Sequence, residues 1–195
     1  MSYLALWADV YRNPIRFADS LPSKPAPAWG FLAALQRALM DSILLYLPLF
    51  LIGRVPPERS YVSFIPDKLY YGTLIGLSPI VLLAEWLLAA ATMHLILRLM
   101  SRRSDFDQIL NITGFVGLGI GSVLLLWDWS WLLIGGMNQY WLGISHLLID
   151  VWGIVVTIIS FMRILQVPIS LGIVLNLVGI AVAMPFAIMF MRSPL

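Results

Sequence analysis

The sequence predicts an all-α membrane protein, a polytopic bundle of five transmembrane helices with a short N-terminal amphipathic helix before it. Hydrophobic residues make up 61% of the 195 residues and charged residues only 11%, which lies outside the usual range of soluble domains. Five apolar stretches, separated by short charged loops, each approach the roughly 20 residues that a helix needs to cross a bilayer. These observations leave no room for a separate soluble domain.

The first 27 residues are expected to form an amphipathic segment and a Pro-rich connector, ahead of a five-span domain at 28–195. Apolar residues recur there at helical spacing beside basic residues, a pattern typical of a helix that lies on the inner membrane surface. A frayed tail is the alternative. The apolar positions are Leu4, Leu6, Trp7, Val10 and Tyr11, and the prolines of the stiff connector are Pro22, Pro25 and Pro27.

The five spans are expected at about residues 31–52, 74–96, 109–127, 144–164 and 169–191. The first is the least regular, because its uninterrupted apolar run covers only Ile43 to Ile52 and the helix must reach back past Arg37 and Asp41. A loop at 128–140 follows the third span. Pro168 precedes the fifth span, at a position where a missing N–H costs nothing.

The distribution of basic residues predicts a cytoplasmic N-terminus and a C-terminus outside, because cytoplasmic loops carry more Lys and Arg. Seven basic residues then fall inside and four outside, with Arg37 left out as intramembrane. If the chain is prokaryotic, its location is the cytoplasmic membrane. The inner residues are Arg12, Arg16, Lys24, Arg98, Arg102, Arg103 and Arg163, and the outer ones are Arg54, Arg59, Lys68 and Arg192. An outer aromatic belt is expected from Trp127, Trp129, Trp131, Tyr140 and Trp141.

Glu85 stands at the midpoint of the second predicted span, where insertion costs about 2.5–3.5 kcal/mol for an Asp and a comparable amount for Glu. We expect it to be protonated, or paired with a group that faces the bundle interior. No Lys or Arg is expected at its depth, so a salt bridge is not predicted. Glu85 then either carries a proton or coordinates a substrate, or it forms a structural hydrogen bond between two helices. Polar residues expected at similar depth are Thr113, Ser122, Thr157 and Asn176.

The other intramembrane polar residues are expected near the span ends. Arg37 and Asp41 lie four residues apart on one helix face, and they either neutralise each other or bind a ligand or partner. Both are expected in one inner layer with four further residues: Asn111, His94, Arg98 and Arg163. His146 and Asp150 are expected at the outer end of the fourth span.

No metal or cofactor is predicted. His94 and His146 should differ by roughly 25 Å in height at 1.5 Å per helical residue, so they cannot share a metal ion. His146 and Asp150 together supply too few ligands for a site. The chain contains no Cys, which excludes disulfides, thiolate zinc sites and Cys catalysis.

Gly117 and Gly121 form a G-x-x-x-G pattern in the third span, which lets a neighbouring helix approach closely. The neighbour belongs either to the same chain or to a second copy.

Several soft motifs together resemble the Yip family, the Ypt/Rab-interacting type of membrane domain. They are Asn13-Pro14-x-x-Phe17 in the leader, the Pro-rich joint, His94 to Leu99 followed by Ser104 to Gln108, Asp150-Val151-Trp152, and Val167 to Ser170. The resemblance covers roughly residues 9 to 190. It implies five spans and a cytosolic N-terminus, and it implies no enzymatic activity.

Two departures place the chain closer to prokaryotic Yip-type members. A glycine run occupies the third span where family members often have Pro, and the Asp-Leu-Trp-Gly-Pro and Tyr-Gly-Tyr signatures of the eukaryotic branch are missing. Binding of Rab GTPases is therefore not carried over to this chain.

The sequence favours a non-enzymatic membrane organiser or interaction partner, because no phosphate loop, nucleophile elbow or zinc-ligand spacing is found. The alternative is a small transporter or lipid-handling protein that uses Glu85. The expected partners are the lipid bilayer and either another membrane protein or a second copy. Nucleic acid is not expected, since the net charge of +2 rests on few charged residues.

Overall fold

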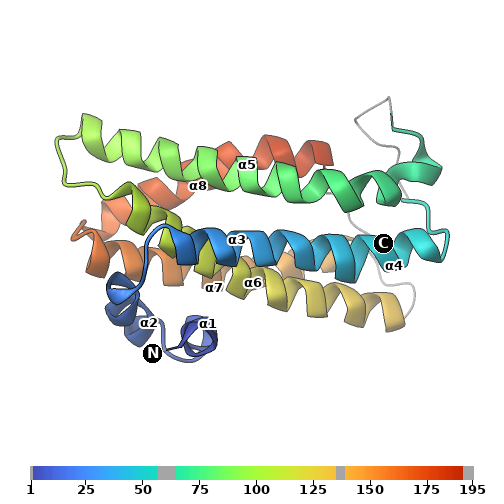
Figure 1. Ribbon diagram of the computed structural model, residues 1–195, viewed down its shortest axis with the longest axis horizontal. Coiled ribbons are helices and arrows are strands. Elements are labelled where there is room, and N and C mark those ends of the chain that lie inside the picture. The colour runs from blue at the N-terminus through green and yellow to red at the C-terminus, as the bar shows by residue number, and fades with distance from the viewer. Residues whose placement is uncertain (1, 57–64, 135–138, 191–195) are drawn as a thin grey trace.

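Five long apolar helices form the structure, a computed structural model that describes residues 2–56, 65–134 and 139–190 (Figure 1). The stretches long and apolar enough to cross a membrane are Ala28–Leu51, Asp67–Leu99, Phe106–Ile134, Tyr140–Ile164 and Ile169–Met189. The chain is therefore an integral, multi-pass membrane protein. No strand occurs in the described ranges, and the predicted all-α bundle is confirmed.

The first span is built from three segments rather than one regular helix. It runs through α3 (Ala28–Met40), a π-helical turn η2 (Asp41–Tyr46) and α4 (Leu47–Leu51). The remaining elements are α1 (Tyr3–Arg12), α2 (Pro14–Ser20), η1 (Leu21–Ser23), η3 (Asp67–Leu69), α5 (Tyr70–Leu99), α6 (Phe106–Ile134), α7 (Gln139–Ile164) and α8 (Ile169–Phe190).

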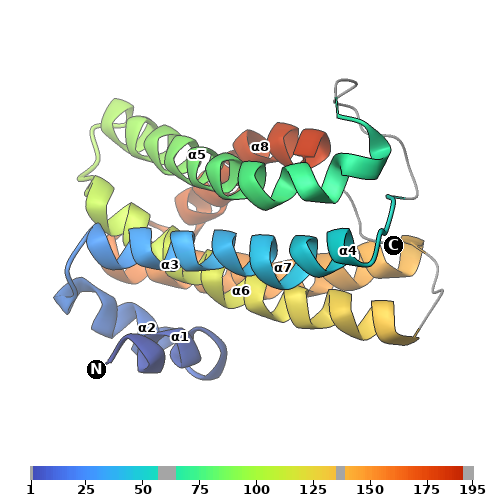
Figure 2. The same cartoon turned by 45° about the vertical axis from the view of Figure 1, so that its right-hand side comes forward.

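Helix α6 forms the centre of the bundle. In its most apolar window 72% of the residues are buried, against 22–33% for the other four spans. It packs against α3, α5 and α7, while α8 packs against α5 and α7. Figures 1 and 2 show α5 and α8 on one side of the bundle, and α3, α6 and α7 on the other. Helices α3, α5 and α7, together with α1, therefore cover much of α6.

Helices α3 and α6 approach each other most closely at Gly30 and Gly114. A Cβ atom on Gly30 would lie 2.5 Å from the Leu110 carbonyl oxygen, and one on Gly114 would overlap the Gly30 carbonyl. The fully buried Asn111 accepts a hydrogen bond of 2.6 Å from the Gly30 N–H through Oδ1. Gly30 lies in the first turn of α3, where N–H groups have no partner within the helix. The contact therefore fixes the start of α3 on α6.

Three prolines lie inside the spans, Pro48, Pro79 and Pro185. The backbone carbonyls that the first two release are bound by side chains of other helices. Pro79 in α5 lacks the N–H that a regular helix directs to the Ile75 carbonyl, and Ser42 Oγ donates to that oxygen at 2.5 Å. Pro48 in α4 likewise leaves the Leu44 carbonyl without its usual donor, and Trp129 Nε1 donates there at 2.8 Å. Lipid offers no replacement partner, so bonds of this kind make proline tolerable in a span.

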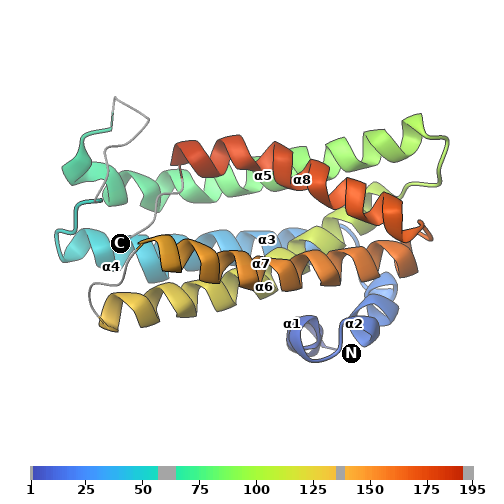
Figure 3. The same ribbon diagram turned by 180° about the vertical axis from the view of Figure 1, so that it is seen from behind.

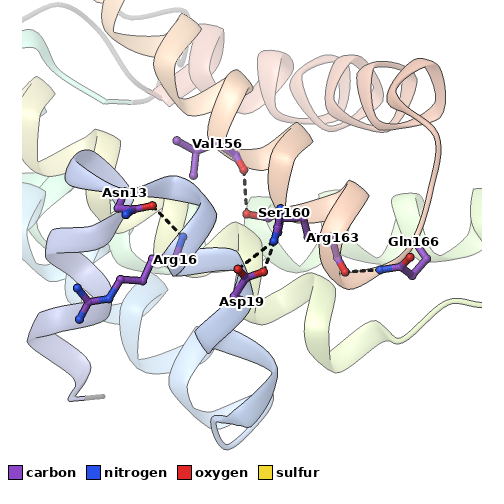
Figure 4. A network of polar contacts seen from close by, with 7 residues as sticks. All are labelled: Asn13, Arg16, Asp19, Val156, Ser160, Arg163 and Gln166. Carbon is purple, nitrogen blue, oxygen red and sulfur yellow. Dashed lines mark hydrogen bonds and ion pairs between the residues drawn. The ribbon is translucent and has the colours of Figure 1, made fainter.

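The N-terminal segment folds as two helices instead of the single predicted amphipathic helix. Asn13 ends α1 and accepts a hydrogen bond from the Arg16 N–H at 3.0 Å, which caps α2, and Pro14 takes the first helical position (Figure 4). The amphipathic character is present, but the apolar faces pack on α6 and α7. The fully buried side chains of α1, α2 and the adjoining η1 are Leu6, Val10, Phe17 and Leu21.

Polar bonds hold these two helices in place. Tyr11 donates its hydroxyl to the Gly119 carbonyl at 2.5 Å, and Asp19 forms a two-point ion pair with Arg163 of α7 at 2.7 and 3.0 Å (Figure 4). Tyr3 donates to Gln36 Oε1 of α3 at 3.0 Å, and burial raises the pKa of Tyr3 to about 12. These bonds connect the N-terminus to three different spans.

The largest differences from the predicted span boundaries are at the start of the second span, which begins at Asp67 instead of near 74, and at the end of the third. Helix α6 continues to Ile134, so residues 128–134, predicted as loop, are helical and carry Asp128 inside the bundle. The prediction failed because a charged residue among tryptophans resembles an interfacial loop, whereas here His146 lies 2.8 Å from the Asp128 carboxylate. The predicted end of the fifth span at 191, and the outer residues Arg59 and Arg192, lie outside the described residues.

Replacing Gly114 with alanine is expected to destabilise the protein, because the added methyl group collides with the Gly30 carbonyl. Overpacking of this kind costs about 1–3 kcal/mol. The matched control is Gly117→Ala on the same helix, where a Cβ meets nothing within 4 Å. Thermal unfolding in detergent should show a lower Tm for Gly114→Ala only. Equal midpoints for the two variants would contradict the close contact.

Candidate functional site

A cavity of about 240 Å³ lies among α3, α5 and α6. It brings ionisable side chains of two different spans together. The residues that line it are Ala34, Arg37, Leu82, Glu85, Trp86, Ala89, Thr113, Gly114 and Gly117. A volume of this size holds several water molecules or a small polar group.

Glu85 faces this cavity from the middle of α5, and its Oε2 atom is buried with no hydrogen-bond partner in the described part of the chain. Its neighbour Trp86 donates its indole N–H to Thr113 Oγ1 at 2.9 Å, and Thr113 donates to the Ile109 carbonyl at 2.8 Å. Those two cavity groups therefore satisfy each other. Glu85 is left to interact with whatever fills the cavity.

The polar residues expected at the depth of Glu85 do not bond to it. Thr113 receives Trp86, while Ser122 and Thr157 donate to carbonyls of their own helices, Leu118 at 2.6 Å and Gly153 at 2.8 Å. Asn176 is buried on α8. A structural hydrogen bond between Glu85 and one of these side chains is not observed.

Arg37 lies at the depth of Glu85, which corrects the prediction that no basic residue reaches this level. It lines the same cavity, forms an ion pair with Asp41 one helical turn later, and interacts electrostatically with Asp128, Glu85 and Asp150. No direct ion pair joins Arg37 and Glu85 among the described residues. Arg37 and Glu85 therefore line one cavity from two different helices, α3 and α5.

Helix α6 shows how far Arg37 has moved from its predicted place. Asn111 contacts Gly30 at the start of α3, whereas Arg37 packs directly against Gly121. Ten residues of α6 separate these two contacts, which is about 15 Å along the helix. Arg37 and Asp41 thus do not share an inner layer with Asn111. The prediction failed because it assumed that Arg37 would extend to the headgroups, while in the structure Asp41 and the bare surface of Gly121 hold it.

The π-helical turn of the first span begins at Asp41, the partner of Arg37. Only 5% of Asp41 is exposed. π-Helical turns are rare, and many of them occur at functional sites. The irregular part of the span therefore adjoins the polar site.

Gly117 and Gly121 do not receive the backbone of a neighbouring helix. Gly117 has open space beside it and lines the cavity, and Gly121 makes room for the Arg37 side chain. The neighbour is α3 of the same chain. Close backbone packing occurs one turn earlier, at Gly114, which the sequence pattern did not single out.

The remaining candidates lie away from the cavity. His94 Nδ1 is 2.8 Å from Ser104 Oγ, so it ties α5 to the loop that follows it. His146 pairs with Asp128 at 2.8 Å. Asp150 is exposed on α7, next to exposed Leu147 and Val151. Within the described ranges no three His, Asp or Glu side chains lie close enough together to hold a metal ion.

Comparison with known proteins gives no match: no family model, curated protein or solved structure resembles this chain closely enough. The site must therefore be interpreted from its own geometry. The resemblance to the Yip family remains an expectation from the residues.

The sequence pointed to Glu85 and to the Arg37–Asp41 pair separately, but not to the single cavity that Glu85 and Arg37 both line. A usable signal was present, because Arg37 is the tenth of the 24 residues from Ala28 to Leu51. If the predicted first span had begun at Ala28 instead of Phe31, Arg37 would have been expected near the middle of the span.

The pair Arg37–Asp41 is expected to behave as one energetic unit. Removing one partner of a buried ion pair leaves an uncompensated charge and costs about 3–5 kcal/mol. Arg37→Met and Asp41→Leu should therefore each lower the free energy of unfolding strongly. The double variant should lose clearly less free energy of unfolding than the two single variants lose together, as measured by unfolding in detergent. Strictly additive losses of free energy would refute the coupling between Arg37 and Asp41.

Proposed function

We propose that this protein is a non-enzymatic, Yip-type membrane protein that moves or holds a small polar group within the bilayer, with Glu85 as its proton carrier. The substrate class is a small polar solute or the polar part of a lipid. One observation carries the proposal: Glu85 and Arg37 line the same intramembrane cavity without forming an ion pair.

The charges around the cavity explain why Glu85 rather than Arg37 exchanges protons. Arg37 already has Asp41 as a partner, so that pair is neutral as a unit. Glu85 has no such partner, and a bare carboxylate is costly at this depth. It takes up a proton when the cavity is empty and releases it when a polar or cationic group replaces the proton.

The proposed orientation places α1, α2 and the α5–α6 loop on the cytoplasmic side, and the location is the cytoplasmic membrane of a prokaryote. The excess of basic residues at that end of the bundle supports this orientation.

Proton flux through proteoliposomes tests the role of Glu85. With a pH-sensitive dye enclosed and a pH gradient imposed, the wild-type protein should dissipate the gradient faster than empty vesicles. Glu85→Gln should reduce the flux to the level of empty vesicles, because an amide does not exchange protons. The control variant is Asp67→Asn, which removes an acid at the end of the same span and should retain wild-type flux.

Flux that is unchanged in Glu85→Gln, with an unchanged Tm, would overturn the proposal. A hydrophobic carbodiimide gives an independent measurement, because it modifies protonated carboxyl groups in apolar surroundings. Labelling should appear on the peptide that contains Glu85 and should decrease as the pH rises.

A membrane organiser is the second candidate, and the position of Asp150 favours it. Ionisable side chains within a span normally face the bundle interior or a partner, yet Asp150 is exposed beside Leu147 (61%) and Val151 (48%). A neighbouring membrane protein or a second copy would cover this face of α7.

Photo-crosslinking in native membranes tests that face. Benzoylphenylalanine in place of Val151 should yield an adduct of higher mass, and adding Asp150→Leu should remove it. The control position is Met184, which is similarly exposed on α8 (52%) and should give no adduct. Equal crosslinking at both positions, or none at Val151, would speak against an interaction site at Asp150.

A further inference from the structure

A second cavity, of about 360 Å³, lies at one end of the bundle, where the loop after α5 meets the loop after α7. Figures 1 and 3 show these two loops at the same end of the molecule. Arg102, Arg103, Asp105 and Gln108 form its polar wall, and Leu165 and Val167 are among its apolar residues. The volume is that of a site for a small organic ligand.

The two arginines of this wall are available for a ligand. Arg16 and Arg163, at the same end, form ion pairs with Asp9 and Asp19. Arg102 and Arg103 are exposed and form no ion pair among the residues that the structure describes. A guanidinium group binds phosphate with paired hydrogen bonds.

The acid in the wall does not cancel this charge. Asp105 accepts a hydrogen bond from the Gln108 N–H at 3.2 Å, as a cap at the start of α6. One carboxylate against two guanidinium groups leaves the wall with a net positive charge. The Gln108 Oε1 atom is buried with no hydrogen-bond partner among the described residues, and the NH2 group of the same amide is a donor that suits a phosphate oxygen.

Both loops are held in defined conformations. Ser101 ends α5 with φ 54° and Gln166 ends α7 with φ 55°, the left-handed region that closes helices. Gln166 Nε2 donates to the Arg163 carbonyl at 2.6 Å, as Figure 4 shows. The cavity is therefore built from fixed turns.

Lipid-facing side chains adjoin the arginines. Leu99 and Met100, just before the loop, are 76% and 52% exposed, and they end a span that faces the acyl chains. A ligand here meets positive charge at one end and hydrocarbon at the other.

We infer that this cavity binds the phosphodiester headgroup of an anionic membrane phospholipid, with its acyl chains lying along the end of α5. Basic pockets between transmembrane helices bind such headgroups. The site shares no lining residue with the Glu85 cavity. The proposed lipid site is therefore independent of the proposed function.

Native mass spectrometry of the full-length protein in neutral detergent tests this site, with short-chain phosphatidylglycerol as the probe. Each arginine near a membrane contributes about 1 kcal/mol to the binding of anionic lipid, roughly fivefold in affinity. The double variant Arg102→Gln/Arg103→Gln should therefore bind about 25-fold more weakly. The matched control, Lys24→Gln/Arg98→Gln, removes equal charge at the same end outside the cavity and should change affinity less than twofold. Arg102→Lys/Arg103→Lys should recover part of the affinity, because the charge returns without the planar fork.

Equal losses in the two double glutamine variants would overturn the site, because the effect would then be surface charge alone. Equal binding of phosphatidylcholine and phosphatidylglycerol by the wild type would overturn the selectivity for anionic lipid. Competition by glycerol phosphate at the same concentration as the lipid would overturn the lipid assignment in favour of a soluble phosphate. An unchanged affinity in the double variant Arg102→Gln/Arg103→Gln would exclude the arginines.

Discussion

Helices α3 and α6 meet backbone to backbone at Gly30 and Gly114, and this contact sets the depth of the polar residues on α3. Because no side chain separates the helices there, Asn111 reaches the Gly30 N–H and fixes the register. Seven residues further on, the same register brings Arg37 against Gly121. A cation that would otherwise extend to the headgroups is thereby held in the middle of the bundle, opposite Glu85.

Backbone hydrogen bonding imposes the second constraint, since lipid supplies no donors or acceptors. The two carbonyls released by Pro48 and Pro79 are bound by Trp129 and Ser42. Each of these hydrogen bonds joins two different helices, so the carbonyl that a proline releases in one helix attaches that helix to another. Both attachments involve the first span or its neighbour α5, close to the π-helical turn that begins at Asp41.

The sequence predicted the fold well because hydrophobic length alone specifies a span. All five spans appear near their expected positions, with the largest differences at the start of the second span and at the end of the third. Depth was predicted less well. It depends on helix register and on which side chain finds a partner, as with Arg37, which needed Gly121 and Asp41 to stay buried. Asp128 was misplaced for the same reason, since its partner His146 lies on another helix. Glu85 was recognised because a carboxylate in mid-span is conspicuous without any knowledge of packing, but the cavity that it faces arises only from the assembled helices.

The attachment of α2 to α7 through Asp19 and Arg163 has a consequence for biogenesis. Helices α1 and α2 are synthesised before the five spans, yet the surfaces that bury Leu6 and Phe17 belong to the third and fourth spans. During synthesis the N-terminal pair must therefore wait, with its apolar faces uncovered, until most of the chain has been inserted. Its docking requires the fourth span, so a segment that is synthesised before all five spans reaches its final place only after most of them.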